Sequence, residues 1–262
     1  MKKPRVAATK SRPVEASAGD VEAVVKGVHG DPFAVLGVHG TTAGFVARCF
    51  IPGAQRATAH LLDGREVGVL KRRDERGFFE GPVDIAERQP LRYHLGNQGG
   101  DWWLADPYTF GPVLGPMDDY YIAEGSHLRL FDKLGAHLIE HEGASGFNFA
   151  VWAPNARRVS VVGEFNEWDG RRHVMRNRKD TGIWEIFIPD VGPGKAYKFE
   201  IVGAQGELLP LKADPYAGRS ELRPATAGSR RSCWRDFSGR HRSHSRSRPA
   251  PRSRPGSRRT RS

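Results

Sequence analysis

The sequence predicts an all-β protein, built from two tandem β-sandwich domains and followed by a disordered basic C-terminal tail. A strand-and-turn pattern occurs twice at an offset of 102 residues, at 44–54 (GFVARCFIPGA) and at 146–156 (GFNFAVWAPNA). Short apolar runs recur between turn signals such as Asp63-Gly64, which is typical of sandwiches. The composition of the chain changes abruptly after residue 217.

The repeat sets the expected domain organisation. Each copy ends in Asp-Pro-Tyr, at 106–108 and at 214–216, an offset of 108 residues. A repeat of about a hundred residues corresponds to one small domain rather than to a solenoid unit. We therefore expect a disordered N-terminus at 1–19, a first sandwich at 20–110, a linker at 111–145, a second sandwich at 146–217 and a disordered tail at 218–262.

Two stretches outside the strands have local signals of their own. Residues 20–28 carry valines at helical spacing, with Asp20 as the expected N-cap and Gly30 as the stop. In the linker, residues 128–137 are expected to form a short helix or a turn.

The strands of the second copy show period-two alternation. Apolar residues occupy every second position, which predicts an inward face along each strand. The predicted inward residues are Phe147, Phe149 and Val151 on the first strand, Trp184, Ile186 and Ile188 on another, and Tyr197, Phe199 and Ile201 on the last, where Lys198 points outward.

The net charge of +11 belongs to the tail alone. Residues 218–262 contain 14 Arg, no Lys and 2 acidic residues, so residues 1–217 retain 27 basic and 28 acidic residues. The tail also lacks Val, Ile, Leu and Met after Leu222, and such a segment cannot bury a core. It could bind nucleic acid non-specifically through Arg–phosphate contacts between Arg230 and Arg261.

Cysteine usage favours a reducing, cytoplasmic compartment. The chain has only Cys49 and Cys233, and Cys49 takes the place of Val151 in the repeat, which indicates a small buried residue. Neither a signal peptide nor an apolar run of membrane length is present in the sequence, so no membrane partner is expected.

Several motifs together resemble one family. These are 31–37 (DPFAVLG), 133–137 (KLGAH), 149–156 (FAVWAPNA), 163–168 (GEFNEW) and 209–217 (LPLKADPYA). By these residues the chain resembles the N-terminal part of bacterial glycogen branching enzymes of the alpha-amylase superfamily, over roughly residues 27–227.

The resemblance implies a fold and a parent activity. Both copies would be immunoglobulin-like sandwiches, and the second would be similar to the family's glycogen-binding module. The parent activity would be the transfer of an α-1,4-glucan segment to form an α-1,6 branch in glycogen biosynthesis. The partner implied is an α-glucan such as glycogen or amylose, and no cofactor is implied.

The chain departs from the family after the second copy. The family continues with a catalytic (β/α)₈ barrel, which needs about 250 residues, whereas 45 follow Ala217 here. The sequence still resembles the family over residues 221–227 (ELRPATA), and after them it becomes rich in Arg, Ser and Pro. We interpret this break as a frameshift or truncation in a branching enzyme gene, so no catalytic residue is expected and the chain itself would at most bind glucan.

By resemblance, Trp168 and Lys198 match glucan-contacting positions of the module. A glucan presents flat apolar faces and hydroxyl edges, so it needs an exposed aromatic platform with a nearby donor. The alternative is that Trp168 is a core aromatic and Lys198 a solvated strand residue, and the sequence leaves both open. Trp184 is expected in the core, and the pair Trp102-Trp103 is expected to pack between domains rather than against sugar.

Other polar groups are expected to carry no chemistry. His137 and His141 have the i, i+4 spacing of zinc ligands but lack a third ligand, so no metal site is expected. The acidic pairs Asp118-Asp119 and Glu140/Glu142 are expected to be surface charges, because nothing sets them across a sugar.

Overall fold

The computed structural model describes residues 15–178, 181–221 and 226–229. The chain divides into two compact units, 1–231 and 232–262, and the second unit lies wholly outside the described residues. The predicted disorder of residues 1–14 and of the tail beyond Ser229 also lies outside them.

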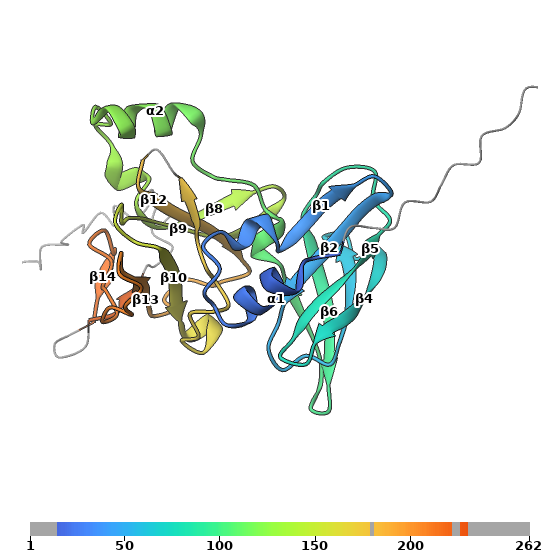
Figure 1. Ribbon diagram of the computed structural model, residues 1–262. Helices are drawn as coiled ribbons and strands as arrows, with labels where there is room; N and C mark the ends of the chain where they lie inside the picture. The colour runs from blue at the N-terminus through green and yellow to red at the C-terminus, as the bar shows by residue number, and fades with distance from the viewer. Residues whose placement is uncertain (1–14, 179–180, 222–225, 230–262) are drawn as a thin grey trace, which may run out of the picture. The chain divides into compact units, whose positions relative to one another are not determined.

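The first copy forms a seven-stranded sheet preceded by a helix (Figure 1). Its elements are α1 (Ala18–Val25), the 3₁₀ turn η1 (Pro32–Ala34), β1 (Gly37–Thr41), β2 (Gly44–Phe50), β3 (Arg56–Leu61), β4 (Glu66–Asp74), β5 (Phe78–Val83), β6 (Leu91–Asn97), β7 (Gly100–Ala105) and the 3₁₀ turn η2 (Pro107–Thr109).

Strand β4 joins the two layers of this sandwich. Its first half pairs with β3 as far as Leu70, and its second half pairs with β5 from Lys71 onward. The strand order is therefore β1-β2-β5-β4-β3-β6-β7 in one folded sheet. The enclosed core is apolar and includes Cys49, which is 1% exposed as its place in the repeat predicted.

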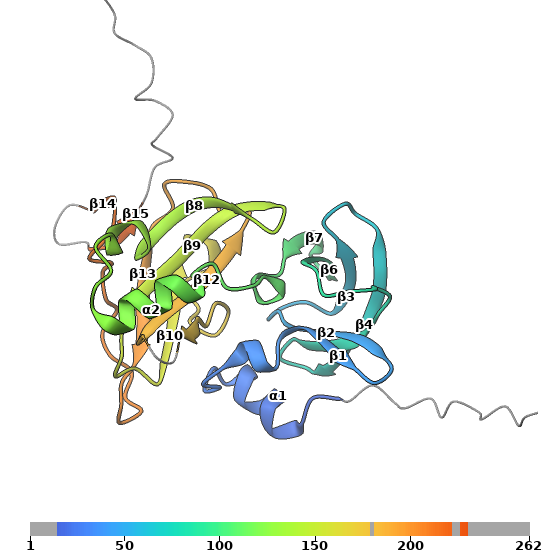
Figure 2. The same cartoon turned by 90° about the horizontal axis from the view of Figure 1, so that it is seen from above.

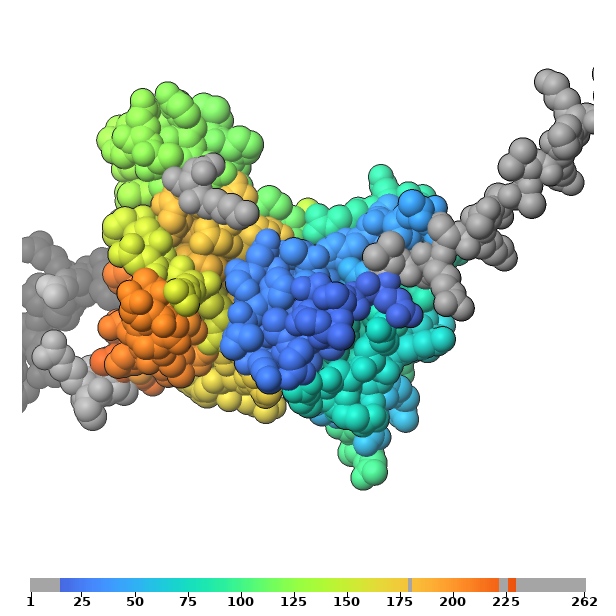
Figure 3. All heavy atoms as spheres, in the orientation of Figure 1, coloured from blue at the N-terminus to red at the C-terminus, as the bar shows by residue number. Residues whose placement is uncertain are grey.

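Helix α1 begins earlier than the sequence predicted. Its N-cap is Ser17, whose Oγ accepts a hydrogen bond from the amide of Asp20 at 3.0 Å, and the helix ends at Val25 rather than at Val28. Asp20 was wrong as the cap because a serine three residues earlier closes the first turn. The helix packs its valines on Phe50 and Phe78 of the first sandwich, and Figure 3 shows it in dark blue on that surface.

The second copy is a sandwich of two separate four-stranded sheets. Its elements are β8 (Gly135–His141), β9 (Ala144–Trp152), β10 (Arg158–Gly163), the 3₁₀ turn η4 (Glu164–Asn166), β11 (Arg176–Arg178), β12 (Ile183–Pro189), β13 (Tyr197–Val202), β14 (Arg219–Ser220) and β15 (Gly228–Ser229). One sheet has the order β11-β12-β9-β8 and the other β10-β13-β15-β14. Figure 2 shows β8, β9 and β12 side by side.

The all-β fold class is confirmed, since the described residues contain only two α-helices, α1 and α2 (Pro116–Glu124). The predicted inward face is also found, because Phe147, Trp184, Tyr197 and their alternating neighbours form one core. No helix of the described residues is long and apolar enough to cross a membrane.

The second sandwich extends past both expected boundaries. Strand β8 lies within the expected linker, which also holds α2 and a 3₁₀ turn η3 (Leu130–Asp132). Strands β14 and β15 lie within the expected tail, where Glu221 donates its amide to the carbonyl of Ala227 at 3.0 Å. The repeat begins at residues 44 and 146, so β8 lies ahead of it, and β14 and β15 lie beyond its closing Asp-Pro-Tyr.

Each copy closes with the same hydrogen-bonded corner. In the first, Tyr93 donates its hydroxyl to Asp106 at 2.9 Å, and the amide of Tyr108 donates to the same carboxyl group at 3.0 Å. A Cβ on Gly37, whose φ is +92°, would lie 2.3 Å from the carbonyl oxygen of Tyr108, so only glycine fits there. Burial raises the pKa of Asp106 to about 7.

The second corner repeats these contacts. Tyr197 donates its hydroxyl to Asp214, and the amide of Tyr216 donates to Asp214 Oδ1 at 2.8 Å. The surroundings differ: Tyr108 is buried and its hydroxyl accepts from the amide of Val174 in the second sandwich, whereas Tyr216 is 38% exposed. The two copies therefore share a folding motif but use its tyrosine differently.

Candidate functional site around Trp168

The loop that carries Trp168 is fixed from inside by one asparagine. Asn166 is fully buried at the end of η4. Its Oδ1 accepts from the amide of Gly163 at 2.8 Å, and its Nδ2 donates to the carbonyl of Val161 at 2.9 Å. The loop leaving β10 is thus tied back to its own strand by a side chain that can both accept and donate.

His173 completes this tie and must be neutral. Asn166 Nδ2 lies 2.9 Å from His173 Nδ1, and because the amide nitrogen is the donor, Nδ1 must be the unprotonated acceptor. Burial agrees with this, since it lowers the pKa of His173 to about 3. The side chain below the loop therefore stays uncharged at neutral pH.

The backbone at Trp168 is strained. Glu167 and Trp168 have φ angles of 58° and 61°, which places two successive non-glycine residues in the left-handed region. Each such residue costs on the order of 1–3 kcal/mol, and such strain often accompanies functional positions. The amide of Trp168 donates to the carbonyl of Gly163 at 3.0 Å, and its side chain is 40% exposed. The fold thus holds this indole at the surface, which excludes the alternative that Trp168 is a core aromatic.

Lys198 lies on the face that this loop crosses. It pairs with Val162 in the β10–β13 ladder and shares its side of β13 with Glu200. A Cβ on Gly170, two residues after Trp168, would lie only 2.0 Å from a carboxylate oxygen of Glu200, so the loop presses against this face. Lys198 is half-buried rather than fully solvated. Gly170 therefore lies against the side of β13 that carries Lys198, and a joint site of Trp168 and Lys198 stays a prediction.

Several charged residues around the Lys198 side of β13 form ion pairs. Arg158 pairs with Glu200 and also donates to the carbonyl of Gly27, ahead of the first sandwich. At the other end of the loop, Asp169 pairs with Arg171 at 2.7 Å. With these neighbours paired, a neutral hydroxyl-rich ligand would meet little uncompensated charge there.

The other two tryptophans of the second sandwich differ in burial. Trp184 is 1% exposed and donates its indole N–H to the carbonyl of Ala153 at 3.1 Å, so it is a core residue as predicted. Trp152, which was not among the predicted site residues, is 62% exposed at the end of β9. The alternation that placed Phe149 and Val151 inward could have flagged it, because it puts the next residue outward.

The interdomain packing predicted for Trp102 and Trp103 is wrong. Trp102 packs against the core of the first sandwich. Trp103 is 46% exposed, and its ring contacts are with residues of its own sheet. Adjacent residues of a strand point to opposite faces, so the pair could not share one role.

The histidines and acids set aside in the sequence have structural roles. His137 and His141 lie on strand β8 and contact the carbonyls of Leu134 and Gly111 at 2.9 and 3.1 Å. Metal-ligating spacing of this kind requires a helix, and no cluster that could hold a metal exists among the described residues. Glu142 accepts from the amide of Gly111 at 3.2 Å, so it is not a free surface charge.

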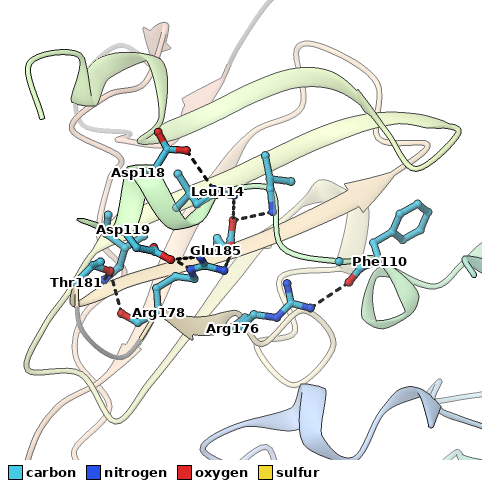
Figure 4. A network of polar contacts seen from close by, with 12 residues as sticks. Phe110, Leu114, Asp118, Asp119, Arg176, Arg178, Thr181 and Glu185 are labelled. Carbon is cyan, nitrogen blue, oxygen red and sulfur yellow. Dashed lines mark hydrogen bonds and ion pairs between the residues drawn. The ribbon is translucent and has the colours of Figure 1, made fainter. Parts of the chain in front are cut away.

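A buried carboxylate that the sequence did not identify anchors the linker (Figure 4). Glu185 of β12 is 1% exposed and accepts from the amides of Val113 and Leu114 at 3.2 and 3.0 Å. Arg178 donates to Glu185 at 3.3 Å and also pairs with Asp119 of α2. Burial raises the pKa of Glu185, whereas the hydrogen bonds from the linker amides and the charge of Arg178 lower it. Asp119, expected as a surface charge, therefore fastens α2 to the sheet.

Its neighbour Asp118 is also engaged. It accepts from the amide of Gly115 and from Lys133 Nζ, both at 3.1 Å, which closes the N-terminus of α2. Both acids of this pair therefore have partners that hold α2 in place.

Comparisons with known proteins match both halves of this architecture. Residues 17–108 match the family described as alpha-1,4-glucan branching enzyme GlgB, N-terminal domain, and residues 133–217 match carbohydrate-binding module 48 (isoamylase N-terminal domain). The 1,4-alpha-glucan branching enzyme GlgB of Mesorhizobium japonicum is 70% identical over 228 residues, which are 87% of this chain and 31% of that protein. The enzyme of the same name from Rhizobium meliloti is 68% identical over 210 residues, covering 80% of this chain and 28% of that protein. The chain thus spans under a third of the length of these relatives.

Proposed function

Because the chain belongs to the GlgB family of 1,4-alpha-glucan branching enzymes, of which it carries the N-terminal portion, we propose that it binds α-glucan through Trp168 and Lys198. The observation that carries this proposal is the strained, half-exposed indole of Trp168, held by the buried Asn166. A glucose ring would stack on the indole, and Lys198 would donate to hydroxyl groups beside it.

The proposed affinity is modest. One stacked ring contributes on the order of 1 kcal/mol, and a single platform with a few hydrogen bonds gives roughly 4–6 kcal/mol in all, which is high-micromolar to millimolar binding. The physiological ligand would be glycogen or a similar polymer in the cytoplasm, a compartment consistent with the buried free thiol of Cys49.

The test is electrophoresis of the whole chain through gels containing glycogen. Wild type should be retarded, and Trp168→Ala should be retarded several-fold less while keeping its thermal stability. Trp152→Ala is the matched control, since it removes an exposed tryptophan from the opposite sheet and should remain retarded. Free migration of the wild type, or retention of the Trp168→Ala variant like wild type, would contradict the proposal.

We further propose that this chain performs no branching reaction itself. The name of its relatives refers to proteins nearly three times as long, and Asp118, Asp119 and Glu185 serve as structural anchors. Incubation with amylose should leave the iodine-stain spectrum unchanged. A time-dependent loss of its long-wavelength band with purified protein would show the opposite.

A further inference from the structure

The first sandwich has an exposed tryptophan, Trp103, that is supported by side chains of neighbouring strands. Trp103 of β7 lies opposite His94 of β6 and is 46% exposed. Its neighbour Trp102 points to the other face and packs into the core. Trp103 is therefore on the outer face of the β3-β6-β7 layer, away from the apolar interior.

Three side chains support the indole from the sheet. The His94 ring lies 4.8 Å from it at an interplanar angle of 30°, and the His60 ring lies 4.8 Å away at 70°. The guanidinium carbon of Arg92 lies 4.9 Å from the centre of the indole. Since His60 comes from β3, on the far side of β6, the indole leans across β6 and presents its remaining surface to solvent. We call Trp103, His60, Arg92, His94 and Asp101 the Trp103 platform.

The platform contains polar atoms that the fold does not explain. His60 is 9% exposed, and its Nε2 has no hydrogen-bond partner among the described residues, although its Nδ1 contacts the carbonyl of Gly64 at 3.1 Å. Arg92 Nε is buried and similarly unpartnered within the described chain. Buried orphan polar atoms cost stability, and an apolar side chain would fill either position without that cost. Both orphan atoms belong to side chains that contact the exposed indole.

The rim of the platform offers neutral polar contacts. Asp101 lies two residues from Trp103 on the same face, and the side chains of Asp101 and His94 are 45% and 41% exposed. Arg56 pairs with Asp101 and so compensates its charge. An aromatic face flanked by hydrogen-bonding groups suits a sugar ring, whereas nucleic acid binding rests on several cations beside the phosphates, and the platform holds one, Arg92.

We propose that the Trp103 platform is a second α-glucan-binding site, separate from the Trp168 site. Its ligand class rests on the proposed function, whereas its location rests on the geometry of the first sandwich alone. Two weak sites on one chain would hold a branched polymer more tightly than either alone, because the second contact becomes intramolecular.

The experiment follows the indole N–H signals of the six tryptophans by NMR, assigned with single Trp→Phe variants, during titration of the whole chain with maltoheptaose. The Trp103 signal should move saturably, and the Trp102 signal is the internal control that should stay. A stationary Trp103 signal at millimolar maltoheptaose overturns this inference even if the Trp168 signal moves. If the Trp103 signal moves and the Trp168 signal does not, the result supports the second site and contradicts the proposed binding through Trp168.

A second measurement tests the polymer and the alternative ligand. Trp103→Ala should weaken retardation by glycogen roughly fivefold, as expected for one stacking contact, and the Trp103→Ala/Trp168→Ala double variant should lose retardation. Unchanged retardation of Trp103→Ala would count against the site. A Trp103 signal that responds to oligo(dT) and not to maltoheptaose would show that the platform stacks bases instead.

Discussion

At the scale of single residues, His173 sets a pH limit on the Trp168 loop. It must be neutral to accept from Asn166, and burial lowers its pKa in the folded chain from 6.5 to about 3. A lowered folded-state pKa means that the unfolded chain binds the proton first, so stability is present above pH 6.5 and is lost as the pH falls toward 3.

We expect the stability advantage of wild type over His173→Gln to shrink by about 2 kcal/mol between pH 7.5 and pH 5. Glutamine can retain a hydrogen bond to Asn166 but does not titrate, which makes it the reference. Urea unfolding at both pH values measures the change. A constant difference between the two proteins would mean that folding does not lower the pKa of His173.

At the scale of elements, one carboxylate couples the linker to the second sandwich. Glu185 accepts from two linker amides and from Arg178, which in turn holds Asp119 of α2. Removing it leaves buried donors unsatisfied, and such groups cost more than the bond itself contributes.

Glu185→Ala should therefore lower the free energy of unfolding by about 2–3 kcal/mol. Glu185→Gln, which keeps an acceptor of similar size, should lose less. Urea denaturation followed by tryptophan fluorescence compares the three proteins. Equal losses for both variants would mean that the charge, rather than the hydrogen bonds to the linker, is what matters.

The elements also show where sequence reasoning succeeded and where it stopped. Alternation along the β12 and β13 strands predicted the core, including Trp184, because an inward face is a local property of a strand. It did not identify β8, which forms a tight hairpin with β9 through the turn at Glu142 and Gly143. It could not predict β15, because the pairing of Gly228 with Tyr197 joins residues that are distant in sequence. Glu185 was missed because the linker amides that it accepts from, those of Val113 and Leu114, lie more than 70 residues away.

The candidate site was predicted in part. Trp168 came from a family resemblance, and its exposure and left-handed backbone agree with a role at the surface. Trp103 was assigned to the wrong contact because its supporting residues, His60 and Arg92, come from two other strands. Only the folded sheet brings them together.

At the scale of the whole molecule, charge is divided unequally between the sandwiches and the tail. Residues 218–262 carry 14 of the 41 basic residues and only 2 of the 30 acidic ones. We expect removal of residues 230–262 to abolish any salt-sensitive gel shift with DNA or RNA, because arginine contacts to phosphate weaken as salt rises. A chain ending at Ser229 that binds equally well would place the basic surface on the sandwiches.

The Asp-Pro-Tyr corner has a consequence for how such chains can lengthen. In the first copy the corner tyrosine, Tyr108, is already inserted against the neighbouring sandwich through Val174. In the second copy the same corner is complete, yet Tyr216 remains 38% exposed. Each copy of the domain thus has, at its C-terminal edge, a folded corner whose tyrosine can contact a neighbouring domain. If such a domain were duplicated in tandem, each copy would already carry the corner tyrosine that contacts the next domain. Only the surface that this tyrosine contacts would have to evolve.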